Sequence, residues 1–530
     1  MTFSGELMLL LWVVASLLLN GIAFLRLATN LRGLNLLGYG AAVGVALHGL
    51  FGWAIAAAPA ARGLFVTILI ALTVLNAAYF LWRRVFQELW SALSKAIKIA
   101  LGLWLLLLVF CLGLLHVEIG KPQSLLNGID IFKTPTTNVR VQYLTSLPAD
   151  NYIPFAVSEF FLRGISFQKE RPILPHAEVS NRTILMSLVA LPFRAALGAP
   201  RDHPELGTFH YLDRDWPDVS KLNTNGAFDQ FSVIGLVLNS LLLLGAIIFC
   251  AGFGARSIVP LATLLYITNP YFIGQTIYTW PKALAGFFIL LAWHSIRAGH
   301  RAVVVAALLA LAFHAHPYAL AFAGWAALFY LLPWRRQKSE LRSLLVFLVT
   351  FTALLLPWII WTRYVLQIPS DLIAQNFSGP GTEIAWTSLM NFIWVRIHNL
   401  FYMVCSTIFL LYPFDLGAAL ERWFVSLPGI VGLVLIYPAL ARCAEFPRPR
   451  SWLWYGLLGP TLSILAIYSC PALPVLHGYQ APLALLLFFG VGWLQRHCSP
   501  RIFARLVALQ LLLNLALVWG RGLSIGAHFW

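Results

Sequence analysis

Apolar segments long enough to cross a membrane recur along the whole chain, and most are separated by short polar gaps. An α-helix rises 1.5 Å per residue, so about 20 apolar residues cross a hydrocarbon core of about 30 Å. On this criterion the pattern predicts about fourteen transmembrane helices. The predicted spans are residues 7–25, 36–58, 63–82, 98–116, 229–252, 257–275, 282–297, 302–316, 317–333, 343–362, 424–441, 452–469, 480–495 and 505–520.

Two segments depart from this alternation. Residues 117–228 form the longest polar gap, and within it NYIPFAVSEFFLRG at 151–164 places its apolar residues near one face, which predicts a short interfacial helix. The apolar segment 397–413 is expected to be re-entrant or interfacial, because counting it as a span would reverse the sidedness of every later loop. The stretch 201–218, rich in Asp, His and aromatic residues, is expected to remain a loop.

These patterns predict an all-α polytopic membrane protein in three parts. Residues 1–116 should form four transmembrane helices, residues 117–228 a large outer loop carrying short helices, and residues 229–530 about ten further transmembrane helices. The first residues, MTFSGEL, lack the basic region of a signal peptide and run directly into an apolar stretch. We therefore expect no cleavage there.

Composition supports a membrane protein. Hydrophobic residues make up 60% of the 530 positions and charged residues 11%, against about 45–50% and about 25% in soluble domains. The six cysteines show no C-x-x-C spacing and lie in or beside predicted spans, so neither a metal site nor a disulfide framework is indicated. A soluble protein is excluded.

The distribution of charge orients the chain. The net charge is +16, and alternate short loops hold 19 basic residues against three acidic ones, Glu88, Glu340 and Glu445. Cytoplasmic loops carry such an excess of Lys and Arg, so these loops are expected in the cytoplasm. We expect a bacterial inner membrane with residues 117–228 in the periplasm; a eukaryotic endomembrane is the other choice. Nucleic acid is excluded as a partner, because the basic residues are dispersed rather than gathered into one patch.

The outer loop contains the first candidates for chemistry. Asp150 precedes the expected helix at 151–164, where a carboxylate can be an N-cap, a general base or a cation ligand. Glu170, Arg171 and His176 combine acid, base and imidazole groups that could bind a phosphate and a hydroxyl together. The alternative for these three is a solvated loop with local ion pairs, each contributing about 0–1 kcal/mol.

Further candidates lie at the outer ends of predicted spans, where ionisable residues are usually paired or functional. Lys282 follows Pro281 at a helix start and would be stabilised by an anionic partner, although it could also extend to lipid headgroups. A histidine at this level can line a cavity or be a buried structural residue. The remaining candidates on this side are His314, His316, Arg363, His477 and Tyr479.

The order of several motifs resembles bacterial members of the GT-C superfamily of integral-membrane glycosyltransferases. These motifs are LPADNYIPFAVSEFFLRG, ERPILPHAEVSNRTILMSLVALP, FDQFSVIGLVLNSL, NPYFIGQTIYTWPKALAGFFILLAW and ALLALAFHAHPYALAF. The similarity covers roughly residues 140–335, and its most specific element is the TWPK at 279–282.

The resemblance implies a sugar donor linked to polyprenyl phosphate and a glycan, lipid or protein acceptor. It also implies that a carboxylate early in the outer loop acts as catalytic base or as ligand of a divalent cation such as Mg²⁺ or Mn²⁺. The matching position is Asp150. Independently of the resemblance, the negative charge that develops on the departing phosphate would be stabilised by cations. Lys282, Arg363 and His316 are the candidates.

Two other function classes fit a chain of this kind. A transporter or flippase of a lipid-linked glycan would show inverted repeats and charges near the bilayer midplane, whereas here the charges gather at the outer ends. An O-antigen polymerase or ligase would instead depend on Arg and His residues of the outer loop, such as His176 and Arg182.

Overall fold

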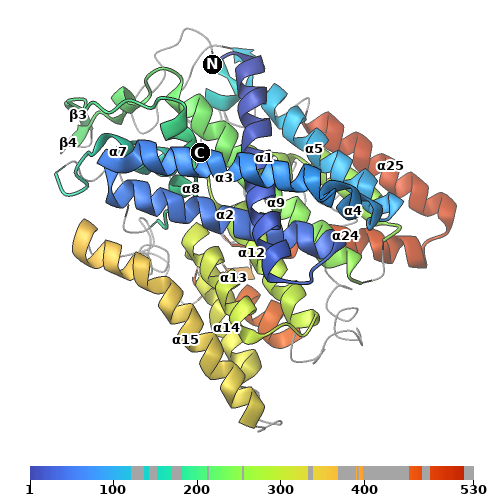
Figure 1. The fold of residues 1–530 in the computed structure, drawn as a ribbon. Coiled ribbons are helices and arrows are strands. Elements are labelled where there is room, and N and C mark those ends of the chain that lie inside the picture. The colour runs from blue at the N-terminus through green and yellow to red at the C-terminus, as the bar shows by residue number, and fades with distance from the viewer. Residues whose placement is uncertain are drawn as a thin grey trace. The chain divides into compact units, whose positions relative to one another are not determined.

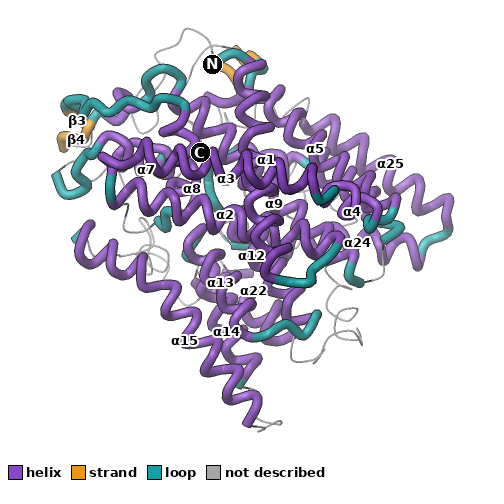
Figure 2. Tube along the Cα trace, viewed as in Figure 1, coloured by secondary structure: helices purple, strands orange, loops and turns teal. Residues whose placement is uncertain are grey.

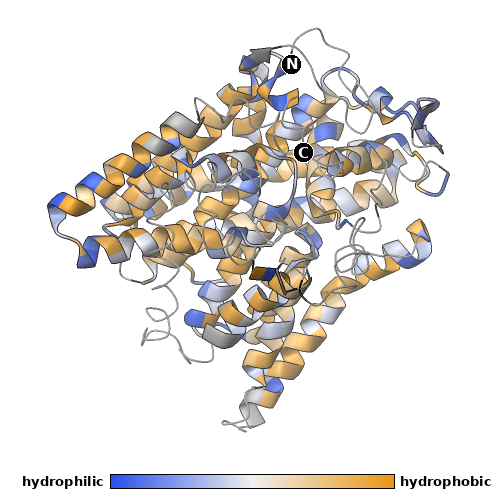
Figure 3. Ribbon diagram, turned by 180° about the vertical axis from the view of Figure 1, so that it is seen from behind, coloured by the Kyte–Doolittle hydropathy of each residue, from blue (hydrophilic) through white to orange (hydrophobic). Residues whose placement is uncertain are grey.

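A computed structural model describes the larger part of the chain. The residues described are 1–120, 137–141, 152–169, 179, 182–211, 214–253, 256–331, 338–367, 390, 393–394, 396–397, 453–467 and 478–518. The described chain is predominantly helical, and its strands are confined to two short two-stranded sheets (Figure 2). Most of the helical ribbon is coloured as hydrophobic (Figure 3). For the described residues, the predicted predominance of helices is therefore confirmed.

Six of the described helical segments are long and apolar enough to cross a membrane. They correspond to predicted spans at both the N-terminal and the central part of the chain. The six segments are Phe3–Ala28, Gly33–Ala57, Pro59–Trp82, Lys95–Leu115, Ala227–Ala251 and Leu341–Leu366. The predicted span 424–441 and the segment 398–413 lie outside the described residues.

The chain divides into two compact units. The first contains the described residues of Met1–Leu241 and Gly274–Pro281, and the second contains those of Leu242–Ile273 and Lys282–Gly522. The four N-terminal helices and the described elements of residues 117–228 therefore belong to one unit.

The first unit begins with long helices and continues with shorter elements (Figure 1). Its elements are α1 (Phe3–Ala28), α2 (Gly33–Ala57), α3 (Arg62–Trp82), α4 (Val85–Ser91), α5 (Lys95–Leu115), β1 (Glu118–Gly120), β2 (Thr137–Asn138), α7 (Ile153–Arg163), α8 (Leu185–Ala196), β3 (Thr208–Tyr211), β4 (Arg214–Pro217) and the first part of α9 (Ala227–Ala251).

Glycines allow α1 and α2 to pack with their backbones in close contact. A Cβ at Gly21 would overlap the carbonyl of Gly40, and one at Gly44 would overlap the carbonyl of Leu17. Small residues at such contacts are typical of helix pairs in membranes, where close packing replaces the hydrophobic effect.

Hydrogen bonds between polar side chains connect α1, α2 and α3. The Ser16 hydroxyl lies 2.9 Å from His48 Nε2 and 3.1 Å from the Thr73 hydroxyl. His48 Nδ1 donates to the carbonyl of Gly44 at 2.8 Å, so Nε2 is the acceptor and Ser16 the donor. These bonds satisfy polar groups that would otherwise face an apolar interior.

Two expectations for residues 117–228 change in the structure. The helix expected at 151–164 is present as α7, but all of its side chains are buried, so it is not an interfacial helix. The stretch 201–218, expected to be a loop, contains the antiparallel hairpin β3–β4, with Thr208 opposite Pro217 and Tyr211 opposite Arg214. Its alternation of aromatic and polar residues suits a strand.

The second unit is a bundle of helices. Its elements are the second part of α9, α10 (Val259–Thr268), α11 (Pro270–Ile277, which crosses the unit boundary), α12 (Lys282–Arg297), α13 (Ala302–Ala315), α14 (Ala319–Tyr330), α15 (Lys338–Ile360), a π-helical turn (Trp361–Leu366), a second π-helical turn (Leu453–Leu458), α22 (Gly459–Ile467), α24 (Gln480–His497) and α25 (Pro500–Leu517).

The span expected at 257–275 is interrupted. Asn269 has φ −79° and ψ 124°, which ends α10. A proline disfavours helical backbone at the residue before it, and Pro270 begins α11. The Asn269 side chain accepts a hydrogen bond from the backbone amide of Tyr271 at 2.9 Å, which caps the new helix.

Candidate functional site

Three of the candidate residues, Lys282, His316 and Tyr479, lie at one end of the second unit. Lys282 is the first residue of α12, directly after Pro281, and only 1% of it is exposed. A proline just before or within the first turn favours a helix start, because its missing amide is not needed there. The sequence therefore places a cationic side chain in a buried position at a helix N-terminus.

The junction of α13 and α14 lies against Lys282. Pro317 favours an extended conformation at His316, which has φ −153° and ends α13. The backbone amide of Tyr318 then donates to His316 Nδ1 at 3.3 Å, and the Tyr318 hydroxyl donates to the Lys282 carbonyl at 2.9 Å. His316 and Tyr318 are both buried.

The start of α24 lies beside Gly286, one turn after the start of α12. A Cβ at Gly286 would lie 3.4 Å from the amide nitrogen of Ala481 and 3.5 Å from the Gln480 Cβ. Tyr479, the N-cap residue of α24, is buried, as is Gln480. Glycine at position 286 thus allows the N-terminal turns of α12 and α24 to approach closely.

The two helices run in the same direction. Towards their C-terminal ends, Trp293 of α12 and Phe489 of α24 each lie 6.3 Å from the ring of Phe249. Because Gly286 meets Gln480 at the other end, both N-termini are at the same end of this unit. We call the group formed there by Lys282, His316, Tyr318, Tyr479 and Gln480 the Lys282 cluster.

The remaining described candidates lie elsewhere. His314 Nε2 donates to the carbonyl of Leu354 on α15 at 2.6 Å, so this histidine joins two helices. Arg363 is exposed on the π-helical turn Trp361–Leu366 and is not part of the buried cluster. Asp150, Glu170, Arg171, His176 and His477 lie outside the described residues.

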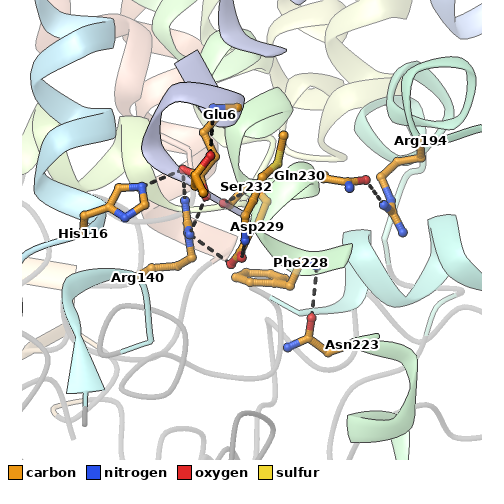
Figure 4. A network of polar contacts seen from close by, with 12 residues as sticks. Glu6, His116, Arg140, Arg194, Asn223, Phe228, Asp229, Gln230 and Ser232 are labelled. Carbon is orange, nitrogen blue, oxygen red and sulfur yellow. Dashed lines mark hydrogen bonds and ion pairs between the residues drawn. The ribbon is translucent and has the colours of Figure 1, made fainter. Parts of the chain in front are cut away.

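A network of charged residues in the first unit was not expected from the sequence (Figure 4). Arg140 lies between two carboxylates: it donates to both oxygens of Glu6 at 2.8 and 3.1 Å, and to Asp229 at 2.9 Å. His116 Nε2 lies 2.9 Å from Glu6. Glu6 is fully buried, whereas Asp229 and His116 keep 23% and 32% of their side chains exposed.

A second buried network begins at the next residue of α9. Figure 4 shows Gln230 directed towards Arg194, to which it is hydrogen-bonded. Arg194 also donates to Glu159 Oε1 at 2.6 Å, and Arg163 donates to Glu159 Oε2 at 3.0 Å. One buried carboxylate therefore has two buried guanidinium partners, which is the pairing that buried charges require.

Tyr152 completes this second network at the start of α7. Its hydroxyl donates to the carbonyl of Val219 at 2.9 Å. Burial, together with the negative charge of Glu159, raises the pKa of the Tyr152 hydroxyl well above its ordinary value of 10.0. The hydroxyl therefore stays protonated and keeps its role as donor.

The sequence contains local indications of some of these ion pairs. Glu159 and Arg163 are four residues apart in a helix that the pattern predicts, a spacing typical of an ion pair, and Arg194 is a lone charge inside an apolar stretch. Nothing local indicates that Arg140 binds Glu6, since the two are 134 residues apart. Long-range pairing of this kind is visible only in the folded chain.

In the described part of the chain, no group of three or more His, Cys, Asp and Glu residues could hold a metal ion. A divalent cation at Asp150 remains an expectation from the resemblance. Comparisons with protein-family models, with curated proteins and with solved structures give no match to this chain.

Proposed function

We propose that the chain is an integral-membrane glycosyltransferase of the GT-C type. It transfers a sugar from a polyprenyl-phosphate-linked donor to a glycan, lipid or protein acceptor at the periplasmic face. The observation that carries this proposal is the burial of Lys282 where the N-termini of α12 and α24 meet.

The two helix N-termini beside Lys282 support an anion site. Each helix N-terminus presents amide groups without intrahelical partners and a positive end of the helix dipole. A lysine at such an end is repelled by that dipole, so a bound anion stabilises the lysine and both helix ends together. The phosphate of a lipid-linked sugar is an anion that such a site accommodates.

The reaction that this site would serve exchanges one bond for another. The acceptor oxygen forms a bond to the anomeric carbon of the sugar while the bond from that carbon to the phosphate oxygen breaks. The phosphate leaves with the bonding electron pair, and the acceptor proton passes to a carboxylate, for which Asp150 is the candidate. Lys282 stabilises the charge that develops on the departing phosphate.

Tyrosine and histidine groups hold this lysine in place. The hydrogen bond from Tyr318 to the Lys282 carbonyl fixes the first turn of α12, and the bond between the Tyr318 amide and His316 fixes the tyrosine's backbone. These bonds fix the backbone from which the Lys282 side chain extends. His316 and Tyr479 are candidates for further donors to the phosphate oxygens.

We propose a multi-pass protein of a bacterial inner membrane with residues 117–228 in the periplasm. Contacts within the first unit support this sidedness. Arg26 pairs with Glu88 at one end of the four long helices, and His116 lies 2.9 Å from Glu6 at the other. The end with residues 26–32 and 83–98 holds six basic residues against Glu88, which is the charge excess of a cytoplasmic face.

Asp150→Asn tests the assigned reaction in cells. We expect the variant to fold, to bind the lipid-linked donor and to leave the glycan unmodified. The reason is that the asparagine amide cannot accept a proton as the aspartate carboxylate does. Asp215→Asn, in the hairpin β3–β4 where 68% of the side chain is exposed, is the matched control and should leave the glycan as in the wild type.

Two outcomes would contradict the proposal. Unchanged glycan in a folded Asp150→Asn variant would remove Asp150 as the base. Movement of the lipid-linked sugar across proteoliposomes by the purified wild-type protein, without transfer to any acceptor, would indicate a flippase instead.

A further inference from the structure

The short helix α4 lies between two helices that are long and apolar enough to cross a membrane. It occupies Val85–Ser91, directly after α3 and shortly before α5. Arg84, which precedes it, has φ 50°, a left-handed conformation that turns the chain sharply out of α3. Because both neighbours are candidate spans, we expect α4 at a membrane surface.

Helix α4 has two apolar faces, of which only one is packed against the protein. Val85 and Leu89 are buried, whereas Phe86 and Trp90, on the other face, are 62% and 42% exposed. The rings of Phe86 and Trp90 stack at 6.0 Å with an interplanar angle of 13°. Trp82, at the end of α3, is 77% exposed.

Two cations lie over these aromatic rings. The Arg83 guanidinium carbon is 5.4 Å from the centroid of Trp82, and Lys98 Nζ is 5.3 Å from that of Trp90. Such cation–π pairs hold the charges beside the aromatic surface. We call the group formed by Trp82, Arg83, Phe86, Trp90 and Lys98 the α4 surface.

Neighbouring residues make this surface strongly basic. The turn between α1 and α2 lies beside it, since a Cβ at Gly33 would lie 3.6 Å from the Ala92 Cβ, and this turn contributes Arg32. Arg84 and Lys95 add two more exposed charges. Glu88, the acidic residue of this region, is paired with Arg26.

We propose that the α4 surface binds the headgroups of anionic phospholipids in the adjacent membrane leaflet. Exposed aromatic rings are characteristic of the level between headgroups and acyl chains, and basic side chains beside them are placed to contact lipid phosphate. The combination selects an anionic lipid over a zwitterionic one. This inference does not depend on the proposed glycosyltransferase activity.

The test compares two phospholipids on the full-length protein purified in detergent. The affinity for phosphatidylglycerol and for phosphatidylcholine is measured by native mass spectrometry of wild type and of Arg83→Gln/Lys98→Gln. We expect the wild type to prefer phosphatidylglycerol and the double variant to lose about thirty-fold of that affinity, since each cation near an anionic surface contributes about a factor of five.

Arg501→Gln/Arg505→Gln, which removes two exposed arginines from α25, is the matched control and should retain the preference. Phe86→Ser/Trp90→Ser removes the aromatic face and should weaken binding of both lipids. Equal affinity of the wild type for the two lipids would overturn the proposal, as would a control variant that loses as much affinity as Arg83→Gln/Lys98→Gln. Preferential binding of an RNA oligomer by the same surface would also overturn it.

Discussion

The hydroxyl of Tyr318 donates a hydrogen bond of 2.9 Å to the carbonyl of Lys282, and both residues are buried. This bond ties the start of α14 to the first turn of α12. It holds the backbone of the one lysine in the Lys282 cluster, on which the proposed phosphate site depends.

Removing that hydroxyl should weaken the second unit. Tyr318→Phe leaves the Lys282 carbonyl without this donor, and we expect a loss of about 1–3 kcal/mol in the free energy of unfolding, measured by titration with SDS. Tyr364→Phe, at a tyrosine that is 71% exposed, should change stability far less. Equal losses in the two variants would show that the Tyr318 bond has no special role.

The buried carboxylate of Glu159 should be essential to the first unit. Glu159→Gln removes the counter-charge of both Arg163 and Arg194. Breaking a buried ion pair by removing one partner costs about 3–5 kcal/mol, whereas Glu88→Gln, at an exposed pair, should cost at most about 1 kcal/mol. The same SDS titration measures both, and a Glu159→Gln variant as stable as Glu88→Gln would contradict the burial of this network.

The close packing of α1 on α2 should make the protein sensitive to a larger residue at the contact. Gly44→Ala places a methyl group into the carbonyl of Leu17, so α1 and α2 must separate and the protein should lose stability or fail to accumulate. Gly102→Ala on α5 is the matched control, because nothing lies within 4 Å of its Cβ position. There the change should be neutral or slightly stabilising, since alanine favours a helix by about 1 kcal/mol over glycine.

The raised pKa of Tyr152 predicts a dependence of stability on pH. In the unfolded chain this hydroxyl ionises near pH 10, but in the folded chain burial raises its pKa well above 10.0. Its contribution to stability is therefore complete below about pH 10 and decreases as the pH rises further.

Tyr152→Phe removes that contribution. The difference in the free energy of unfolding between wild type and this variant should be constant up to about pH 10 and should fall above it. A difference that stays constant at higher pH would show that the folded and unfolded states ionise alike.

Local sequence rules predicted helix positions well. Pro281 before Lys282, Pro317 after His316 and the four-residue spacing of Glu159 and Arg163 each act within a few residues, so the sequence shows their effects directly. The break between α10 and α11 also has a local cause, at Asn269–Pro270. Hydropathy averaged over a span conceals it, because the apolar residues continue on both sides.

The grouping of candidate residues required the fold. In the sequence, the candidates at the ends of predicted spans could not be told apart. They include Lys282, His314, His316, Arg363 and Tyr479. Whether such residues meet depends on how the helices pack, and only Lys282, His316 and Tyr479 share one end of the bundle. The contact that decides this is Gly286 against Gln480, between residues far apart in the chain.

Binding of polyprenyl phosphate to the purified protein tests the central claim most directly. The dissociation constant is measured for wild type, Lys282→Met, Lys282→Arg and the exposed-residue control Lys169→Met. We expect Lys282→Met to bind at least about ten-fold more weakly, since a hydrogen bond to a charged group contributes about 1.5–3 kcal/mol. Lys282→Arg should retain part of the affinity and Lys169→Met all of it. A folded Lys282→Met variant that binds polyprenyl phosphate as tightly as the wild type would contradict the account.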